Sequence, residues 1–125
     1  MEIMRAFLLV GIIASLISAA SAIGGTATFY SKYVPSACYG NTDNGVWIAA
    51  AGAALWNGGA VCGQSYNVRC TGATNGVPHP CRDGSVTVKI VDQCPGCPAA
   101  LDLSQEAFAK IADPVAGVIK IEYNR

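Results

Sequence analysis

The chain has 125 residues, and its 8 Lys and Arg balance 8 Asp and Glu, so the formal net charge at pH 7 is +0. This length predicts a single domain. The charge balance excludes the basic surface on which nucleic-acid binders depend, so we expect no nucleic-acid partner. Charged residues make up 13% of the chain and hydrophobic residues 52%. Disordered chains combine few hydrophobic residues with a high net charge, so this composition excludes a disordered chain.

The N-terminal segment is typical of a secretory signal. Arg5 supplies a positive charge, residues 6–17 form an apolar stretch, and Ala20-Ser21-Ala22 matches the small-residue cleavage pattern. A membrane anchor needs about 20 apolar residues with basic flanks, which this segment lacks, so we expect no membrane insertion. The pattern predicts a signal peptide over residues 1–22, a mature N-terminus at Ile23, and a secreted protein.

Six cysteines follow the predicted cleavage site. An even number of cysteines in a short secreted chain indicates a disulfide framework, here of three bridges. Spacing alone leaves the pairing open, because six cysteines can be joined in many ways. The six are Cys38, Cys62, Cys70, Cys81, Cys94 and Cys97.

The first half of the mature chain alternates short apolar runs with turns. The β-prone residues 26–30 predict a first strand, and residues 31–45, rich in Asn, Asp and Gly, predict a long surface loop. The apolar run 46–51 predicts a second strand. Residues 53–57 predict one helical turn, which Gly58-Gly59 ends.

The second half carries the clearer periodicities. Residues 64–69 predict a strand, and a Gly- and Pro-containing loop follows over 71–84. Alternating apolar residues predict strands over 86–91 and 119–123, and Ser104 is positioned to N-cap a helix that ends at residue 111 or 112. Several short strands with one substantial helix favour a small closed β-barrel over a sandwich with open edges.

The segment Cys94-Pro95-Gly96-Cys97 is a C-x-x-C motif. In a cytosolic chain with βαβ patterning this motif would indicate a thioredoxin-like redox site. Here the predicted secretion and the four other cysteines favour a structural bridge. His79 is the only histidine and has no suitably spaced second ligand pair, so we expect no metal site and no cofactor.

Asp92 and Asp102 are the carboxylates of most interest. Glycoside hydrolysis needs two carboxylates, so these two could form an acid–base pair. Alternatively, Asp102 caps or orients the following helix and Asp92 satisfies backbone donors at a turn. Residue chemistry alone favours this second interpretation. We expect the remaining acidic residues to be solvated surface or helix-end charges: Asp43, Asp83, Glu106, Asp113 and Glu122.

The aromatic residues allow two interpretations. They could form a face on which a carbohydrate stacks, or they could lie in the core with their polar ends near water. The sequence does not distinguish these arrangements for Tyr30, Tyr33, Tyr39, Trp47, Trp56 and Tyr66.

The order of several short motifs resembles the first domain of expansins. Gly25-Thr26-Ala27-Thr28-Phe29-Tyr30 is similar to the opening of that domain, and the resemblance extends over residues 24–125. Further motifs follow in the family's order: Ala37-Cys38-Tyr39-Gly40, Leu55-Trp56-Asn57-Gly58-Gly59, Cys62-Gly63, Val68-Arg69-Cys70, Val91-Asp92-Gln93-Cys94-Pro95 and Leu101-Asp102-Leu103-Ser104. Length and cysteine spacing most resemble the plant natriuretic peptide group, short expansin-like proteins similar to family 45 endoglucanases.

This resemblance implies a mainly β fold for residues 23–125. The implied fold is a single six-stranded double-psi β-barrel, with one or two short helices, stapled by disulfides. The resemblance also implies the bridges Cys38–Cys62 and Cys70–Cys81, which leave Cys94–Cys97 as a local loop. It further implies a plant protein located in the apoplast.

Departures from the wider family bear on catalysis. Family 45 endoglucanases have a second catalytic Asp just after the first strand, whereas Ser31, Lys32 and Tyr33 follow that strand here. We therefore expect no enzyme activity and no catalytic residue. The resemblance still implies a polysaccharide-binding groove, because Thr28, Asp92 and Asp102 match positions important for wall loosening. With Tyr30, two residues after Thr28, they would form this groove.

The resemblance gives two functional hypotheses. The first is a non-enzymatic protein with a systemic role in water and solute balance, which acts on a cell-surface receptor as a monomer. Its signalling segment would match residues 30–63, with Tyr30, Tyr33, Cys38, Trp56, Cys62 and Gly63. The alternative is a cell-wall polysaccharide-binding or wall-loosening protein without hydrolase activity.

Overall fold

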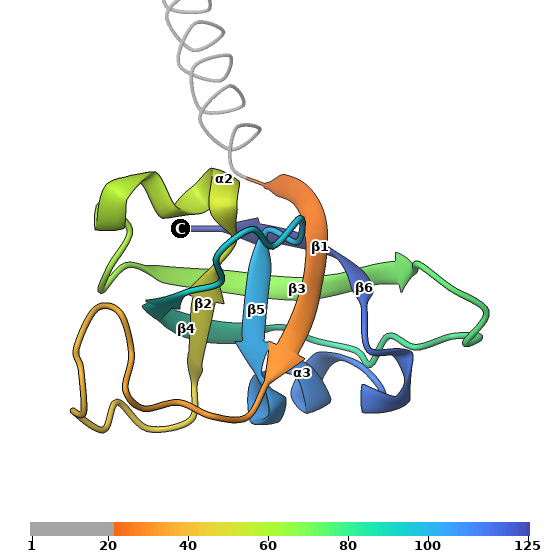
Figure 1. Ribbon diagram of the computed structural model, residues 1–125. Helices are drawn as coiled ribbons and strands as arrows, with labels where there is room; N and C mark the ends of the chain where they lie inside the picture. Colours follow the sequence, from red (N-terminus) through yellow and green to blue (C-terminus); the bar gives the residue numbers. More distant parts are fainter. Residues whose placement is uncertain (1–21) are drawn as a thin grey trace, which may run out of the picture.

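The computed structural model describes residues 22–125, and six strands close into a barrel (Figure 1). The predicted signal peptide lies outside the described residues except for Ala22. Around the barrel the strand order is β1-β5-β2-β4-β3-β6, so the prediction of a small closed barrel is confirmed. The strands are β1 (Ile23–Tyr30), β2 (Ile48–Ala51), β3 (Ser65–Ala73), β4 (Val86–Gln93), β5 (Leu101–Ser104) and β6 (Ile119–Asn124).

Alternation along the strands fills the barrel. Val86, Val88 and Ile90 of β4 are buried, and β6 repeats the pattern with Ile119 and Ile121. The side chains between them face outward, as the period of two requires. Both strands that the sequence predicts from alternation are therefore confirmed.

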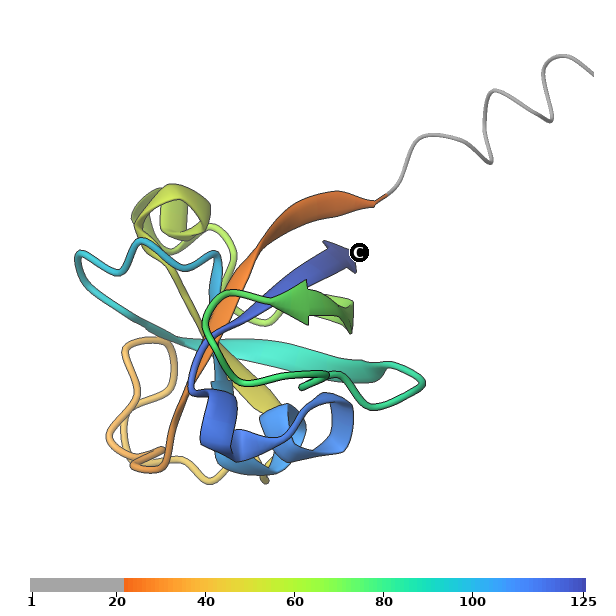
Figure 2. The ribbon, with the colours of Figure 1, turned by 90° about the vertical axis from the view of Figure 1, so that its right-hand side faces the viewer.

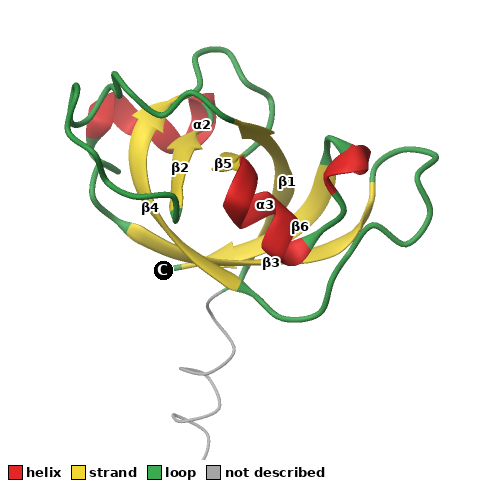
Figure 3. Cartoon of the chain, turned by 90° about the horizontal axis from the view of Figure 1, so that it is seen from below, coloured by secondary structure: helices red, strands yellow, loops and turns green. Residues whose placement is uncertain are grey.

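Within the described range 22–125, two short helices lie at opposite ends of the barrel. The helix α2 (Ala53–Trp56) continues into the 3-10 turn η1 (Asn57–Gly59), and α3 (Gln105–Ile111) is followed by the 3-10 turn η2 (Pro114–Ala116). Seen from below, α3 lies across the barrel mouth (Figure 3). Within residues 22–125, no helix combines the length and the apolar character that crossing a membrane requires.

The start of α3 matches the sequence prediction. Ser104 is its N-cap, and the Ser104 Oγ accepts a hydrogen bond of 3.1 Å from the Ala107 N–H. Such a cap satisfies one of the backbone donors that every helix start leaves free. On its inner face the helix buries Ala107, Phe108 and Ile111 against the barrel.

The sequence did not indicate β5 as a strand. β5 has four residues, and its middle contains Asp102, so it shows too little alternation for a local pattern to reveal it. It forms because β1 pairs with it in parallel and β2 pairs with it antiparallel. Distant strands therefore decide the conformation of this segment, which the sequence describes only as the approach to a helix.

Other boundaries also differ from the predictions. β1 begins at Ile23 rather than at residue 26, because its first residues pair with β6. β3 extends to Ala73, because Gly72 and Ala73 pair with β6 after a register shift that follows Cys70. β2 begins only at Ile48, since the backbone carbonyl of Val46 instead accepts a hydrogen bond from the Ser104 hydroxyl.

Two long loops project from opposite sides of the barrel (Figures 1 and 2). The first connects β1 to β2 and the second connects β3 to β4. The disulfides Cys38–Cys62, Cys70–Cys81 and Cys94–Cys97 are the pairs that the resemblance implies. The first of them ties the β1–β2 loop to the segment just before β3.

Candidate functional site

Strand register brings together the polar residues that the sequence singled out. Thr28 on β1 pairs with Asp102 on β5, Asp102 pairs with Ala50 on β2, and Ala50 pairs with Asp92 on β4. In this row of paired residues only Ala50, with its small side chain, therefore lies between the two aspartates. Tyr30 lies two residues after Thr28 and shares its face of β1. We call Thr28, Tyr30, Asp92 and Asp102 the polar cluster.

Asp102 is held by a threonine hydroxyl. The Thr28 Oγ1 donates a hydrogen bond of 2.8 Å to the Asp102 Oδ1. Burial raises the pKa of the Asp102 carboxyl, the charge of Asp92 raises it further, and the hydrogen bond from Thr28 partly offsets both effects. The helix-capping interpretation of Asp102 is wrong, since Ser104 performs that role.

Asp92 organises backbone, as one of the two interpretations predicts. Its Oδ1 accepts hydrogen bonds from the N–H groups of Ala37, at 2.9 Å, and Gln93, at 2.8 Å. The first of these bonds joins the β1–β2 loop to the end of β4. The other oxygen, Oδ2, makes no hydrogen bond with any residue from 22 to 125 and is free to accept one from a ligand.

Tyr30 contributes a donor without an acceptor. Its hydroxyl oxygen is buried and has no hydrogen-bond partner among residues 22–125. Burial raises the pKa of the Tyr30 phenol, and the charges of Asp92 and Asp102 raise it further, so the phenol remains protonated at neutral pH. Leaving a buried polar group unpaired costs about 1–3 kcal/mol. Among residues 22–125 it is the only buried side-chain nitrogen or oxygen without a hydrogen-bond partner.

A second polar pair lies next to the cluster, and the sequence analysis missed it. The rings of Tyr30 and Tyr33 meet edge to face with centroids 5.3 Å apart, and the Tyr33 hydroxyl donates a hydrogen bond to the Glu106 carboxylate. Burial and this hydrogen bond raise the pKa of Tyr33 to about 12, and the same bond lowers the pKa of Glu106. Glu106 is a helix-end charge, as predicted, because it lies in the first turn of α3, and it also accepts the hydrogen bond from Tyr33. Its partner lies 73 residues away, so no local pattern indicates it.

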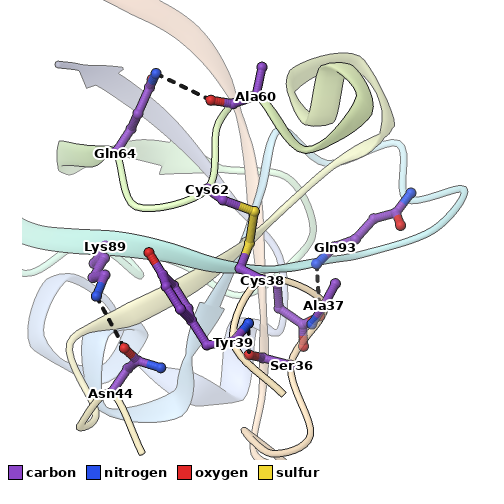
Figure 4. The surroundings of a disulfide bond; sticks show 11 residues. Ser36, Ala37, Cys38, Tyr39, Asn44, Ala60, Cys62, Gln64, Lys89 and Gln93 are labelled. Carbon is purple, nitrogen blue, oxygen red and sulfur yellow. Dashed lines mark hydrogen bonds between the residues drawn. A yellow bond between two sulfur atoms is a disulfide. The ribbon is translucent and has the colours of Figure 1, made fainter. Parts of the chain in front are cut away.

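The β1–β2 loop is fastened to the barrel around the Cys38–Cys62 bridge (Figure 4). The Lys89 Nζ lies 4.5 Å from the centroid of the Tyr39 ring and donates a hydrogen bond of 3.1 Å to the Asn44 Oδ1. The Cys38 N–H also donates to the Val91 carbonyl oxygen, at 3.0 Å. Covalent, cation–π and backbone contacts therefore all fix this loop.

The six residues predicted for a signalling segment fall in three places. Tyr30 and Tyr33 adjoin the polar cluster, and Cys38 and Cys62 form the bridge of Figure 4. Gly63 lies beside this bridge, where a Cβ would approach the Tyr39 hydroxyl to 2.8 Å. Trp56 is the last residue of α2, which lies at the end of the barrel opposite α3 (Figure 1). The segment does not present these residues as one surface.

The structure also distinguishes the aromatic residues. Tyr66 is in the core, where its ring packs edge to face on Tyr123. Trp47 is 50% exposed, and the Lys110 Nζ lies 5.5 Å from its ring centroid. The aromatic residues thus do not form a single stacking face. Among residues 22–125, no group of three or more His, Cys, Asp or Glu side chains could hold a metal ion.

Comparisons with known proteins identify the family. A family described as lytic transglycolase matches residues 48–123. An EG45-like domain containing protein of Citrus jambhiri is 67% identical over 111 residues, which cover 86% of this chain and 85% of that protein. Expansin-B4 of Arabidopsis thaliana is 40% identical over 91 residues, which cover 62% of this chain but 33% of the expansin.

A solved structure supports the same conclusion. An expansin variant of Clavibacter michiganensis, in complex with cellohexaose, superposes with a TM-score of 0.62 at 28% identity, over 82% of this chain and 48% of that one. The fold and these matches define an expansin-like double-psi β-barrel protein. Within that class, the chain belongs to the family of EG45-like domain containing proteins.

The raised pKa of Asp102 predicts a pH-dependent effect of Asp102→Asn on stability. Since burial penalises the ionised carboxyl, its unfavourable contribution is absent below the unfolded-state pKa, near 3.8, and develops as the pH rises through the folded-state pKa. The asparagine variant, whose Oδ1 can still accept from Thr28, should therefore be more stable than wild type at neutral pH and equally stable at acidic pH. Urea unfolding across this pH range measures the difference, and a variant equally destabilised at every pH would contradict it.

Proposed function

We propose that this protein binds polysaccharide of the plant cell wall, a β-1,4-glucan in the first instance, through the polar cluster and without hydrolysing it. The observation that carries the proposal is the unpaired Tyr30 hydroxyl beside Asp92 and Asp102. A sugar hydroxyl both donates and accepts hydrogen bonds, so it can accept from Tyr30 while it donates to a carboxylate. The complex of a related expansin with cellohexaose supports this class of ligand.

The absence of hydrolysis is proposed from the carboxylates near the site. A glycosidase needs one carboxyl as acid and a second as base or nucleophile across the scissile bond. After β1 the first acidic residue is Asp43, which is exposed and whose Oδ1 accepts a hydrogen bond of 2.7 Å from the Gly45 N–H. One oxygen of Asp92, Oδ1, already accepts from the N–H groups of Ala37 and Gln93. The stretch directly after β1, Ser31-Lys32-Tyr33, contains no carboxylate for this second role.

Tyr30→Phe tests the proposal directly. Because the hydroxyl has no partner among residues 22–125, its removal should leave stability unchanged or slightly increased. Loss of a hydrogen bond to the glycan should weaken retention on insoluble β-1,4-glucan by about tenfold, which corresponds to about 1.4 kcal/mol. Pull-down isotherms on cellulose and on isolated walls measure this change.

Tyr123→Phe is the matched control, since this tyrosine lies in the core on β6 and should leave retention unchanged. Equal retention by wild type and Tyr30→Phe would contradict binding through the cluster. In the same preparations, wild-type protein should release no reducing sugar from β-1,4-glucans. Measurable release that Asp102→Asn abolishes would show instead that the protein is a hydrolase.

A second candidate is the role in water and solute balance, with residues 30–63 acting on a cell-surface receptor. It is favoured by the firm attachment of the β1–β2 loop, whose exposed residues are held in a fixed shape by Cys38–Cys62 and Tyr39. Swelling of wall-free protoplasts tests it. Wild-type protein should cause swelling, whereas a response that requires walls would exclude this candidate.

Both candidates place the protein outside the cell. Three disulfides and no free cysteine among residues 22–125 are typical of an oxidising compartment. The mature protein from apoplastic fluid should begin at Ile23. Extracellular material that begins at Met1 would contradict the predicted cleavage.

A further inference from the structure

The third disulfide differs from the other two in the loop that it closes. Cys94 and Cys97 are separated by 3 positions in sequence, whereas the other bridges span 24 and 11. The stabilisation from a disulfide grows with the length of the closed loop, so this bridge contributes least to holding the barrel folded. Pro95 and Gly96 between the two cysteines are exposed, and both cysteines are half-buried.

Backbone hydrogen bonds hold the ends of this turn independently of the bridge. The Cys94 N–H donates to the Ala51 carbonyl oxygen, at 2.8 Å. Beyond Cys97, the Ala100 N–H donates to the Thr26 carbonyl oxygen, at 3.0 Å, and the Ala100 carbonyl oxygen accepts from the Gly52 N–H, at 2.9 Å. Opening the bridge therefore leaves β4 and β5 anchored to their neighbours.

A cavity adjoins one of the two cysteines. It has a volume of about 690 Å³, and Cys97 lines it whereas Cys94 does not. Residues at the start of β1, in α2 and in the segment before β5 line it. These elements lie at the end of the barrel opposite α3 (Figure 1). Its walls include Gly24, Ala54, Pro98 and Tyr123, so it is lined largely by small and apolar side chains.

We propose that Cys94–Cys97 is a thiol–disulfide exchange site for a low-molecular-weight thiol, which enters through this cavity and attacks Cys97. The thiolate forms a bond to the Cys97 Sγ, the Cys94–Cys97 bond breaks, and its electron pair leaves on Cys94, which takes up a proton. A second thiolate then attacks the mixed disulfide at its own sulfur and releases Cys97. In sum, two thiols are oxidised to one disulfide and the protein bridge is reduced to two thiols. The proposal is independent of polysaccharide binding.

The test exposes the folded, disulfide-intact mature protein to reduced glutathione, with alkylation at timed intervals and peptide mapping. Cys94 and Cys97 should become alkylated at least about tenfold faster than the other four cysteines, as expected for the more labile bridge. At early times the glutathione adduct should be on Cys97. Reduction of Cys38–Cys62 or Cys70–Cys81 at the same rate, or an early adduct on Cys94, would overturn the proposal.

A pair of alanine substitutions tests the route of entry. Ala54→Leu adds bulk to the cavity wall from an exposed position on α2. Ala60→Leu adds the same bulk nearby, where it lines a different cavity that lacks the cysteines. Glutathione exchange should slow about threefold or more in Ala54→Leu and remain at the wild-type rate in Ala60→Leu. Equal rates in the two variants would show that the thiol does not enter through the cavity.

Discussion

Gly52→Ala should be among the most destabilising single substitutions in the barrel. Gly52 is buried between β2 and α2, and an added Cβ would lie 1.9 Å from the backbone carbonyl oxygen of Ala99. Backbone cannot rotate away as a side chain can, so β2 and the segment before β5 would have to separate. We expect a loss of about 3 kcal/mol, because overpacking typically costs 1–3 kcal/mol and here the clash is with backbone.

Thermal unfolding measures this loss as a decrease in Tm of roughly 10–20 °C for a domain of this size. Gly76→Ala is the control, since its added Cβ would have no atom within 4 Å. That variant should be as stable as wild type or about 0.4–1 kcal/mol more stable, because alanine restricts the unfolded chain. Equal Tm values for Gly52→Ala and wild type would show that the approach of Ala99 is not rigid.

The elements that the sequence predicts best are those that local physical rules specify. β4 and β6 follow from apolar alternation, and α3 follows from a serine N-cap with apolar residues at helical spacing. In each case the neighbouring residues contain the whole signal. The closed barrel followed because five such strands with one helix leave few alternatives.

Pairings between distant segments were not accessible in this way. β5 exists because β1 and β2 flank it, and the Tyr33–Glu106 hydrogen bond joins residues 73 positions apart. The pattern around Glu106 is that of any charge in the first turn of a helix. Tyr33 and Glu106 meet only because the folded barrel brings the loop after β1 to the start of α3.

The polar cluster was predictable from the sequence only in part. Resemblance to expansins named Thr28, Tyr30, Asp92 and Asp102, but the chemistry of an isolated Asp102 favoured a helix cap. Strand register decides the matter, because pairing across β1, β5, β2 and β4 turns separate residues into one row. The unpaired Tyr30 hydroxyl, on which the proposed glycan binding depends, results from burial that the sequence does not show.

The Cys38–Cys62 bridge should be worth more to stability than Cys94–Cys97. It closes the longest of the three loops. The residues on either side of Cys38 make two further contacts: the Ala37 N–H donates to Asp92, and the Tyr39 ring packs against Lys89. From loop length alone, its removal should cost roughly 3–4 kcal/mol, against roughly 2 kcal/mol or less for the short turn. Paired serine substitutions remove each bridge without leaving a free thiol.

Denaturant unfolding of the two double variants measures the difference in the free energy of unfolding. In thermal unfolding, Tm should be lower by roughly 5 °C or more in Cys38→Ser/Cys62→Ser than in Cys94→Ser/Cys97→Ser. The first variant should also retain less on β-1,4-glucan, because the freed β1–β2 loop no longer presents the Ala37 N–H to Asp92. The second should bind as wild type does, since the backbone on both sides of its turn remains hydrogen-bonded. A larger loss of Tm and of glucan retention in Cys94→Ser/Cys97→Ser would mean that the short turn, and not the β1–β2 loop, fixes the end of β4 that carries Asp92.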